Sequence, residues 1–237
     1  MAAKKSIKKI SISLVIPTYN DEKVIKEQLL ACERILKQFC NEFEIIVSDD
    51  ASHDSTPQIL TQIAHNRKKI RLENNRQNIG ITANVRKLYL LAKKEFVMFY
   101  SADGDWDPND LKKIIFTQIK NNADIVIGKR RRKIGYTPYR HFVSFMHRFL
   151  PLILFGVDTK DPGGIKLIKR SLAQIELVSK SQLFEAEMVI RAKKSGAKLC
   201  WCEVKYKKPS IGAGFGGNFN SALASFVDLI RLRLLIP

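Results

Sequence analysis

The feature that most constrains the fold is a regular alternation, through the first half of the chain, of short apolar runs with segments of helical periodicity. Strands are predicted at 11–16, 43–47, 70–72, 95–100 and 124–127, and helices at 22–39, 55–64, 80–92 and 108–120. A helix between two strands permits a parallel crossover, and strands that are apolar throughout are typical of sheets buried on both faces. We therefore predict an α/β fold with a mostly parallel central sheet and helices on both faces.

The second half is less regular. An amphipathic segment that is basic and aromatic is expected at 139–155, and the Gly-containing link 161–164 leads into further elements. These are a strand at 165–168, a helix at 185–194, a strand at 198–206, a Gly-rich loop at 209–218 and an amphipathic helix at 219–235. Because no internal repeat or low-complexity linker divides the sequence, we predict one domain over 1–237.

The charge is unusual for a globular domain. The chain has 41 Lys and Arg against 23 Asp and Glu, a net charge of +18. Such a surplus favours an anionic partner, which could be a nucleic acid, a phosphorylated substrate or an acidic membrane surface. The longest apolar stretch, 149–157, is about half of a membrane span and is interrupted by Pro151 and Gly156. The basic first residues are not followed by an apolar signal core, so a cytoplasmic chain without a transmembrane helix or signal peptide is expected.

Polar residues follow four of the predicted strands. The runs are 17–21, 49–54, 101–107 and 128–133, of which the first three are acidic and the last is cationic. Ligands of open parallel sheets bind at the carboxyl ends of the strands, so we expect these runs to meet along one edge.

Asp103-Gly104-Asp105 is the sharpest of these patterns. Two carboxylates one residue apart can share a hard divalent cation, Mg²⁺ or Mn²⁺, with phosphate oxygens. A plain turn is the alternative, since Asp-Gly is common in turns. Asp50 is placed to accept hydrogen bonds from a ribose or a base. The later GxGxxG match at 212–217 lacks a following βαβ unit, and a flap beside Lys207 and Lys208, or a flexible linker, explains it better.

Together these motifs resemble glycosyltransferase family 2, the inverting class that uses nucleotide sugars. The matching segments are Leu14–Asn20, Val47–Ser52, Asn78–Gly80 and Asp103–Asp105, within 11–130. Within the family, residues 128–130, 164–170 and 184–191 resemble the dolichyl- and polyprenyl-phosphate sugar synthases. The resemblance implies a Rossmann-like fold of glycosyltransferase A type. It also implies a nucleotide-sugar-binding half at 11–130, an acceptor half with a Gly-rich flap at 131–218 and an amphipathic C-terminal helix at 219–237.

The resemblance also assigns roles to individual residues. It implies nucleoside contacts from Pro17, Tyr19, Asp21 and Asp50, and diphosphate and metal contacts from Ala102, Asp103 and Asp105. Lys208 would meet the donor phosphates, and Arg130, Arg140 and Ser144 would bind the acceptor phosphate. The implied catalytic set is Asp103, Asp105, Arg130 and Glu187, the last orienting the acceptor or supporting the arginines.

The implied reaction is metal-dependent, inverting transfer from a GDP-mannose or UDP-hexose type of donor to a polyprenyl or dolichyl phosphate. The segment 139–155 could then lie peripherally at the cytoplasmic face of a membrane, where a separate membrane protein could recruit the chain. One alternative is transfer to a saccharide hydroxyl in cell-surface glycan synthesis, with Glu187 or Asp161 as base. Others are a nucleotidyltransferase and a basic nucleic-acid-binding protein, although the absence of a known nucleic-acid module argues against a nucleic-acid partner.

Overall fold

The computed structural model describes residues 10–101, 103–131, 136–206 and 219–236. The strands are β1 (Ile10–Thr18), β2 (Cys40–Asp49), β3 (Ile70–Asn74), β4 (Phe96–Phe99), β5 (Ile125–Arg130), β6 (Lys166–Lys169) and β7 (Leu199–Val204). The helices are α1 (Ile25–Phe39), α2 (Thr56–His65), α3 (Gly80–Leu91), α4 (Asp110–Asn121), α5 (Pro138–Phe155), α6 (Arg170–Ala173), α7 (Phe184–Lys194) and α8 (Phe219–Leu235). The predicted strands and helices are thus present with ends shifted by a few residues, and the short α6 is an addition.

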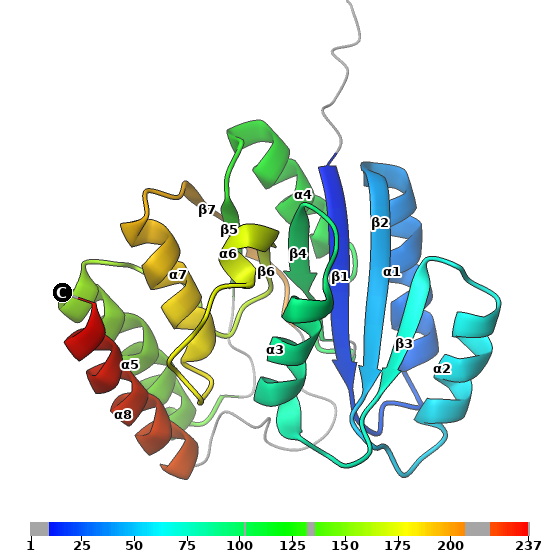
Figure 1. The fold of residues 1–237 in the computed structure, drawn as a ribbon, viewed down its shortest axis with the longest axis horizontal. Helices are drawn as coiled ribbons and strands as arrows, with labels where there is room; N and C mark the ends of the chain where they lie inside the picture. The colour runs from blue at the N-terminus through cyan, green and yellow to red at the C-terminus, as the bar shows by residue number, and fades with distance from the viewer. Residues whose placement is uncertain (1–9, 102, 132–135, 207–218, 237) are drawn as a thin grey trace, which may run out of the picture.

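The strands form one sheet of seven in the order β3-β2-β1-β4-β6-β5-β7 (Figure 1). All neighbours are parallel except β6, which runs antiparallel to both β4 and β5. The mostly parallel sheet is therefore confirmed. The division into halves at residue 130 stays a prediction, because β6 of the second half is inserted between two strands of the first.

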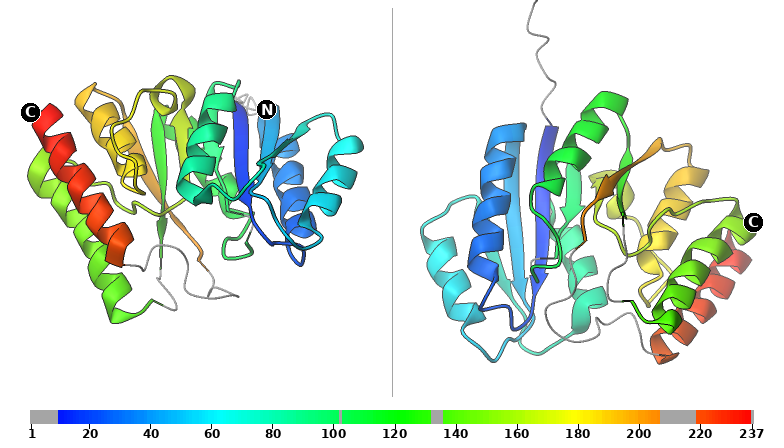
Figure 2. Two further views of the ribbon diagram at one scale, coloured as in Figure 1. Left: turned by 60° about the horizontal axis from the view of Figure 1, so that its bottom comes forward. Right: turned by 180° about the vertical axis from the view of Figure 1, so that it is seen from behind.

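Alternating side chains of each strand build two cores, one on either side of the sheet. Ile12 and Leu14 of β1 pack with α1, α2 and α4, whereas Val15 faces the core formed with α3 and α7. Two further views show α5 and α8 side by side at the end of the sheet, as an outer helix pair beyond α7 (Figure 2).

The outer helix pair leaves much apolar surface uncovered. Most of the exposed large apolar side chains of the described residues lie on these two helices, among them Phe142, Phe145, Ile153, Phe226 and Ile230. Phe145 and Phe149 stack on each other, with ring centroids 5.0 Å apart. Among the residues that the structure describes, no helix has the length and apolarity needed to cross a bilayer.

Candidate active site

The loops after β1 and β2 are fastened to each other at the carboxyl edge of the sheet. The Asp21 carboxylate accepts hydrogen bonds from Thr18 Oγ1, at 2.7 Å, and from the Tyr19 amide, at 3.2 Å. The Asn20 amide donates to Ser52 Oγ, at 2.9 Å. Burial raises the pKa of Asp21, and repulsion from Asp103 contributes. β1 and β4 are parallel neighbours in the sheet, so their exits share one acidic rim. Tyr19 is exposed beside it.

At this rim, Asp50 is held by hydrogen bonds from the neighbouring loop. Its buried carboxylate accepts from Asn75 Nδ2, at 2.7 Å, and from the Ile79 and Gly80 amides, each at 2.9 Å. These bonds hold the turn in which Gly80 adopts a φ of +80°, a conformation that favours glycine. Asp50 thus orders the loop before α3, and its contact with a nucleoside stays a prediction.

Asp103 and Asp105 lie in one turn after β4. Asp103 accepts from the Asp105 amide, at 3.0 Å, and from Ser101 Oγ, at 2.8 Å. Asp105 is buried and accepts from the Tyr206 hydroxyl at 3.2 Å. Ala102, between Ser101 and Asp103, lies outside the described residues.

The donor chemistry of this turn fits a divalent cation. Within the described residues no group of three or more His, Cys, Asp or Glu side chains could hold a metal. Mg²⁺ usually takes one or two protein carboxylates and completes its shell with water and substrate phosphates. A pair of carboxylates on an acidic rim, where like charges already repel, therefore suits a cation that arrives with a diphosphate.

Arg130 at the end of β5 is committed to a buried ion pair. Its Nε and Nη2 donate to Asp161 at 2.8 and 2.5 Å, and its Nη1 donates to the Tyr136 hydroxyl at 2.5 Å. The guanidinium lies within 6 Å of the ring centroids of Trp106, Tyr136 and Tyr206. We call these three rings the aromatic cluster. The Asp161 bonds raise the pKa of Arg130 although burial opposes them. Arg130 therefore forms a wall of the site. In its predicted contact with an acceptor phosphate, the phosphate and Asp161 would both bind the same Arg130 guanidinium.

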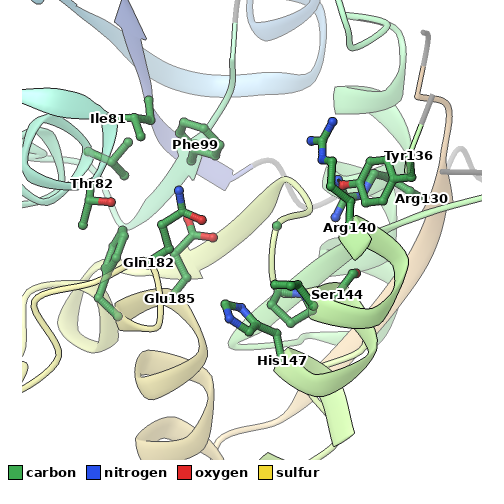
Figure 3. Close-up of a pocket in the computed structure, with 15 residues that line it drawn as sticks. Ile81, Thr82, Phe99, Arg130, Tyr136, Arg140, Ser144, His147, Gln182 and Glu185 are labelled. Carbon is green, nitrogen blue, oxygen red and sulfur yellow. Dashed lines mark hydrogen bonds between the residues drawn. The ribbon is translucent and has the colours of Figure 1, made fainter. Parts of the chain in front are cut away.

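A cavity of about 270 Å³, which we call the rim cavity, opens between α3, α5, α7 and the link before β6. Figure 3 shows Arg130, Tyr136 and Arg140 at one side, Gln182 and Glu185 at the other, and Ser144 and His147 projecting from α5 between them. The Arg140 guanidinium lies 4.3 Å from the Tyr136 ring centroid and forms no ion pair within the described residues. The structure therefore places Arg130, Arg140 and Ser144 around one cavity, and their binding of an acceptor phosphate stays a prediction.

Glu187 does not join this group. It is fully buried on the far side of α7, where it accepts from the Val178 and Ser179 amides at 3.0 and 2.7 Å and from Arg191 Nε at 2.7 Å. The expected role beside the acceptor is therefore not supported, because these bonds fix the 178–179 loop instead.

The carboxylate that lines the rim cavity is Glu185, two residues earlier. Its Oε2 accepts from Lys166 Nζ at 2.7 Å, and Lys166 is completely buried. Sequence reasoning missed Lys166, Glu185 and the aromatic residues Tyr136 and Tyr206. The pairing of Lys166 with Glu185 has no local sequence signal, because 19 residues separate them. Lys208 and the Gly-rich flap lie outside the described residues.

Comparison with known proteins adds family and fold. The model of the family described as glycosyl transferase family 2 matches residues 13–174. A dolichyl-phosphate beta-glucosyltransferase of Trichomonas vaginalis is 31% identical over 177 residues, covering 68% of this chain and about half, 52%, of that protein. A second one from the same organism is 29% identical, covering 95% of this chain and 73% of that protein.

Among solved structures, the fold resembles glucosyl-3-phosphoglycerate synthase from Mycobacterium tuberculosis, crystallised with Mn²⁺, UDP and glucosyl-3-phosphoglycerate. The TM-score is 0.73 at 16% identity, with 96% of this chain and 81% of that chain covered. The glycosyltransferase A type of fold expected from the sequence is thereby confirmed.

Proposed function

Because the chain belongs to glycosyl transferase family 2, a family of sugar-transferring enzymes, we propose that it transfers a hexosyl group, glucosyl first among them, from a nucleotide sugar to a polyprenyl or dolichyl phosphate. The observation that carries this proposal is the junction of two oppositely charged regions. Tyr206 donates to Asp105 at 3.2 Å, and the Arg130 guanidinium lies 5.4 Å from the centroid of the same ring. A metal-bound diphosphate and an anionic acceptor would therefore meet across the aromatic cluster.

On the donor side, the acidic rim supplies the groups that the reaction needs. Asp103 and Asp105 would hold Mg²⁺ or Mn²⁺, and the bound ion supplies positive charge to the departing diphosphate. The hydrogen bond from the Asp105 amide to the Asp103 carboxylate keeps the two side chains in one turn, so neither must be ordered when the donor binds. The exposed Tyr19 ring, on the loop fastened by Ser52, is available to the nucleoside.

On the acceptor side, the pairing of the carboxylates favours a phosphate over a sugar hydroxyl. A hydroxyl acceptor needs a general base, whereas a phosphate monoester is already anionic near neutral pH. Glu185 is bound by Lys166, and Asp161 by Arg130, so each carboxylate beside the rim cavity is already paired with a cation. Arg140, which forms no ion pair with any described residue, provides a positive charge that an anionic acceptor would use.

Transfer is tested with radiolabelled UDP-glucose and GDP-mannose, each offered polyprenyl phosphate or a soluble oligosaccharide, with Mn²⁺, Mg²⁺ or EDTA. We expect a labelled lipid product only with metal. Asp103→Asn should lower the rate at least about 100-fold, because a metal contributes several kcal/mol to such reactions. Asp107→Asn, in the same loop, is the matched control. Product formed solely on the oligosaccharide would end the lipid-acceptor proposal.

We extend the proposal to peripheral membrane contact through the outer helix pair. Its uncovered apolar side chains and the net charge of +18 together suit an anionic bilayer surface. Co-sedimentation with vesicles of phosphatidylcholine and phosphatidylserine tests this. Ile153→Ser, on α5, should weaken binding about tenfold. Leu90→Ser, an equally exposed position on α3, should not, since the exposed fractions are 61% and 65%. Equal losses in both variants would contradict this orientation.

A further inference from the structure

A second cavity lies between α5 and α8, beside the rim cavity. We call it the helix-pair cavity. It has a volume of about 190 Å³ and is walled chiefly by Phe142, Met146 and Leu150 of α5 and by Ala222, Phe226 and Leu229 of α8. Ser225 also borders it, but its hydroxyl already donates to the Ser221 carbonyl at 2.9 Å. Among the described residues, the lining is therefore apolar apart from Ser225 and His147.

His147 and Val143 line both cavities and thus form the boundary between them. The Nε2 atom of His147 is buried and has no hydrogen-bond partner among the described residues. A buried polar atom without a partner costs about 1–3 kcal/mol, so such atoms usually have a ligand, water or functional reason. Burial lowers the pKa of His147, which favours the neutral ring with one N–H donor.

We propose that the helix-pair cavity receives the first isoprene unit of the acceptor, and that His147 Nε2–H donates a hydrogen bond to the phosphate at the boundary. This rests on the lipid-phosphate acceptor proposed above. The two cavities match the two parts of that ligand. Arg140 and Ser144 line the rim cavity, on the phosphate side of His147, and apolar side chains line the helix-pair cavity on its other side.

The size of the cavity limits what it can hold. An apolar protein cavity of about 150 Å³ accepts one benzene molecule. The helix-pair cavity, at about 190 Å³, is therefore large enough for one five-carbon isoprene unit. The remaining units would leave between the helices onto the exposed apolar face that includes Phe226 and Ile230. A saccharide acceptor would leave this space without a matching group.

The test is equilibrium binding by titration calorimetry, without donor, of farnesyl phosphate and of inorganic phosphate. We expect the wild-type protein to bind farnesyl phosphate at least tenfold more tightly, since one buried CH₂ contributes about 0.8 kcal/mol. Ala222→Phe fills the cavity and should remove this preference. Ala224→Phe, two residues later on the exposed side of α8, is the matched control and should keep it. Ala222→Met fills the same space with a smaller side chain, in case the Phe variant is unstable.

His147 has its own test. His147→Leu should weaken farnesyl phosphate binding about tenfold, and His147→Gln, which retains an N–H donor, should restore part of it. The inference is overturned if the wild-type protein prefers farnesyl phosphate no more than inorganic phosphate, or if Ala222→Met and Ala224→Phe bind it equally. Tail-dependent binding without any sugar transfer would refute the proposed function and leave this site standing. Sugar transfer by a protein that binds farnesyl phosphate no more tightly than inorganic phosphate would support the proposed function and refute this site.

Discussion

Lys166→Met probes the buried ion pair beneath the rim cavity. The Lys166 ammonium is completely enclosed and donates to the Pro162 carbonyl at 2.6 Å, the Gly164 carbonyl at 2.9 Å and Glu185 Oε2 at 2.7 Å. All three of its N–H bonds are therefore used. Methionine has a similar length but no donor. Among the described residues, the variant therefore leaves the Glu185 carboxylate with the distant Tyr89 hydroxyl alone, at 3.5 Å.

The expected loss follows from that isolation. Removing one member of a buried ion pair destabilises a protein by about 3–5 kcal/mol, because an uncompensated charge remains. For a chain of this size each kcal/mol shifts the melting temperature by about 2–4 °C, which gives a decrease of roughly 6–20 °C. Replacing both members by apolar residues is often neutral, so adding Glu185→Met should recover most of the stability.

The assay is urea unfolding at pH 7, followed by tryptophan fluorescence and far-UV circular dichroism. Lys169→Met, on the same strand, is the matched control. The Lys169 side chain is 47% exposed and its ammonium lies 3.4 Å from Asp124, so we expect a loss of at most about 1 kcal/mol. The reasoning is refuted if Lys166→Met costs no more than Lys169→Met, or if the double variant is less stable than Lys166→Met alone.

Three further predictions concern single substitutions. Gly164→Ala should cost about 3 kcal/mol or more in urea unfolding, because its Cβ would lie 2.2 Å from the Gly128 carbonyl oxygen. Asp158→Asn should lower the urea midpoint at pH 7, because Arg148 and then Lys160 hold the pKa of Asp158 below its usual range. A depressed carboxyl pKa stabilises above the unfolded value, so this deficit should shrink as the pH falls below about 4, and a constant deficit would contradict the ion pair. Glu187→Gln should cost about 1–3 kcal/mol, since an amide nitrogen would face a backbone N–H, while the KM for the acceptor stays unchanged; a raised KM would return Glu187 to the acceptor site.

The fold was largely predictable because its signals are local. Apolar runs such as 14–16 and 45–47 and the helical spacing of 22–39 depend only on neighbouring residues. The direction of β6 was not predictable. The Gly164 amide donates a hydrogen bond to the Asp161 carbonyl, at 3.0 Å, which closes a turn before β6. Gly164 then enters the sheet beside Gly128, at the carboxyl edge of the sheet. A strand that starts at that edge must run antiparallel to its neighbours, and no periodicity encodes this.

In the candidate site, too, the features set by local sequence were predictable and those set by long-range contacts were not. The turn that holds Asp103 and Asp105, and its place beside the exit of β1, follow from residue type and strand order. The partners of charged residues in the second half do not, because they lie far apart in sequence. Arg130 meets Asp161 across 31 positions, and Lys166 meets Glu185 across 19. The family resemblance selected Glu187, whereas packing directs Glu185 into the rim cavity.

One backbone crossing links these long-range pairs. Gly164 can approach the Gly128 carbonyl because neither residue has a side chain. This approach sets Asp161 against the Arg130 amide at 2.9 Å and, on the other side of the link, turns Lys166 toward Glu185. The two cations and two carboxylates beside the rim cavity are thus positioned by the start of β6 and not by the loops that hold the acidic rim. Substitutions at Gly164 should accordingly disturb acceptor binding and leave nucleotide and metal binding intact, whereas those at Asp103 should do the opposite. If Gly164→Ala that still folds lost nucleotide binding in parallel with acceptor binding, this separation of the two regions would be wrong.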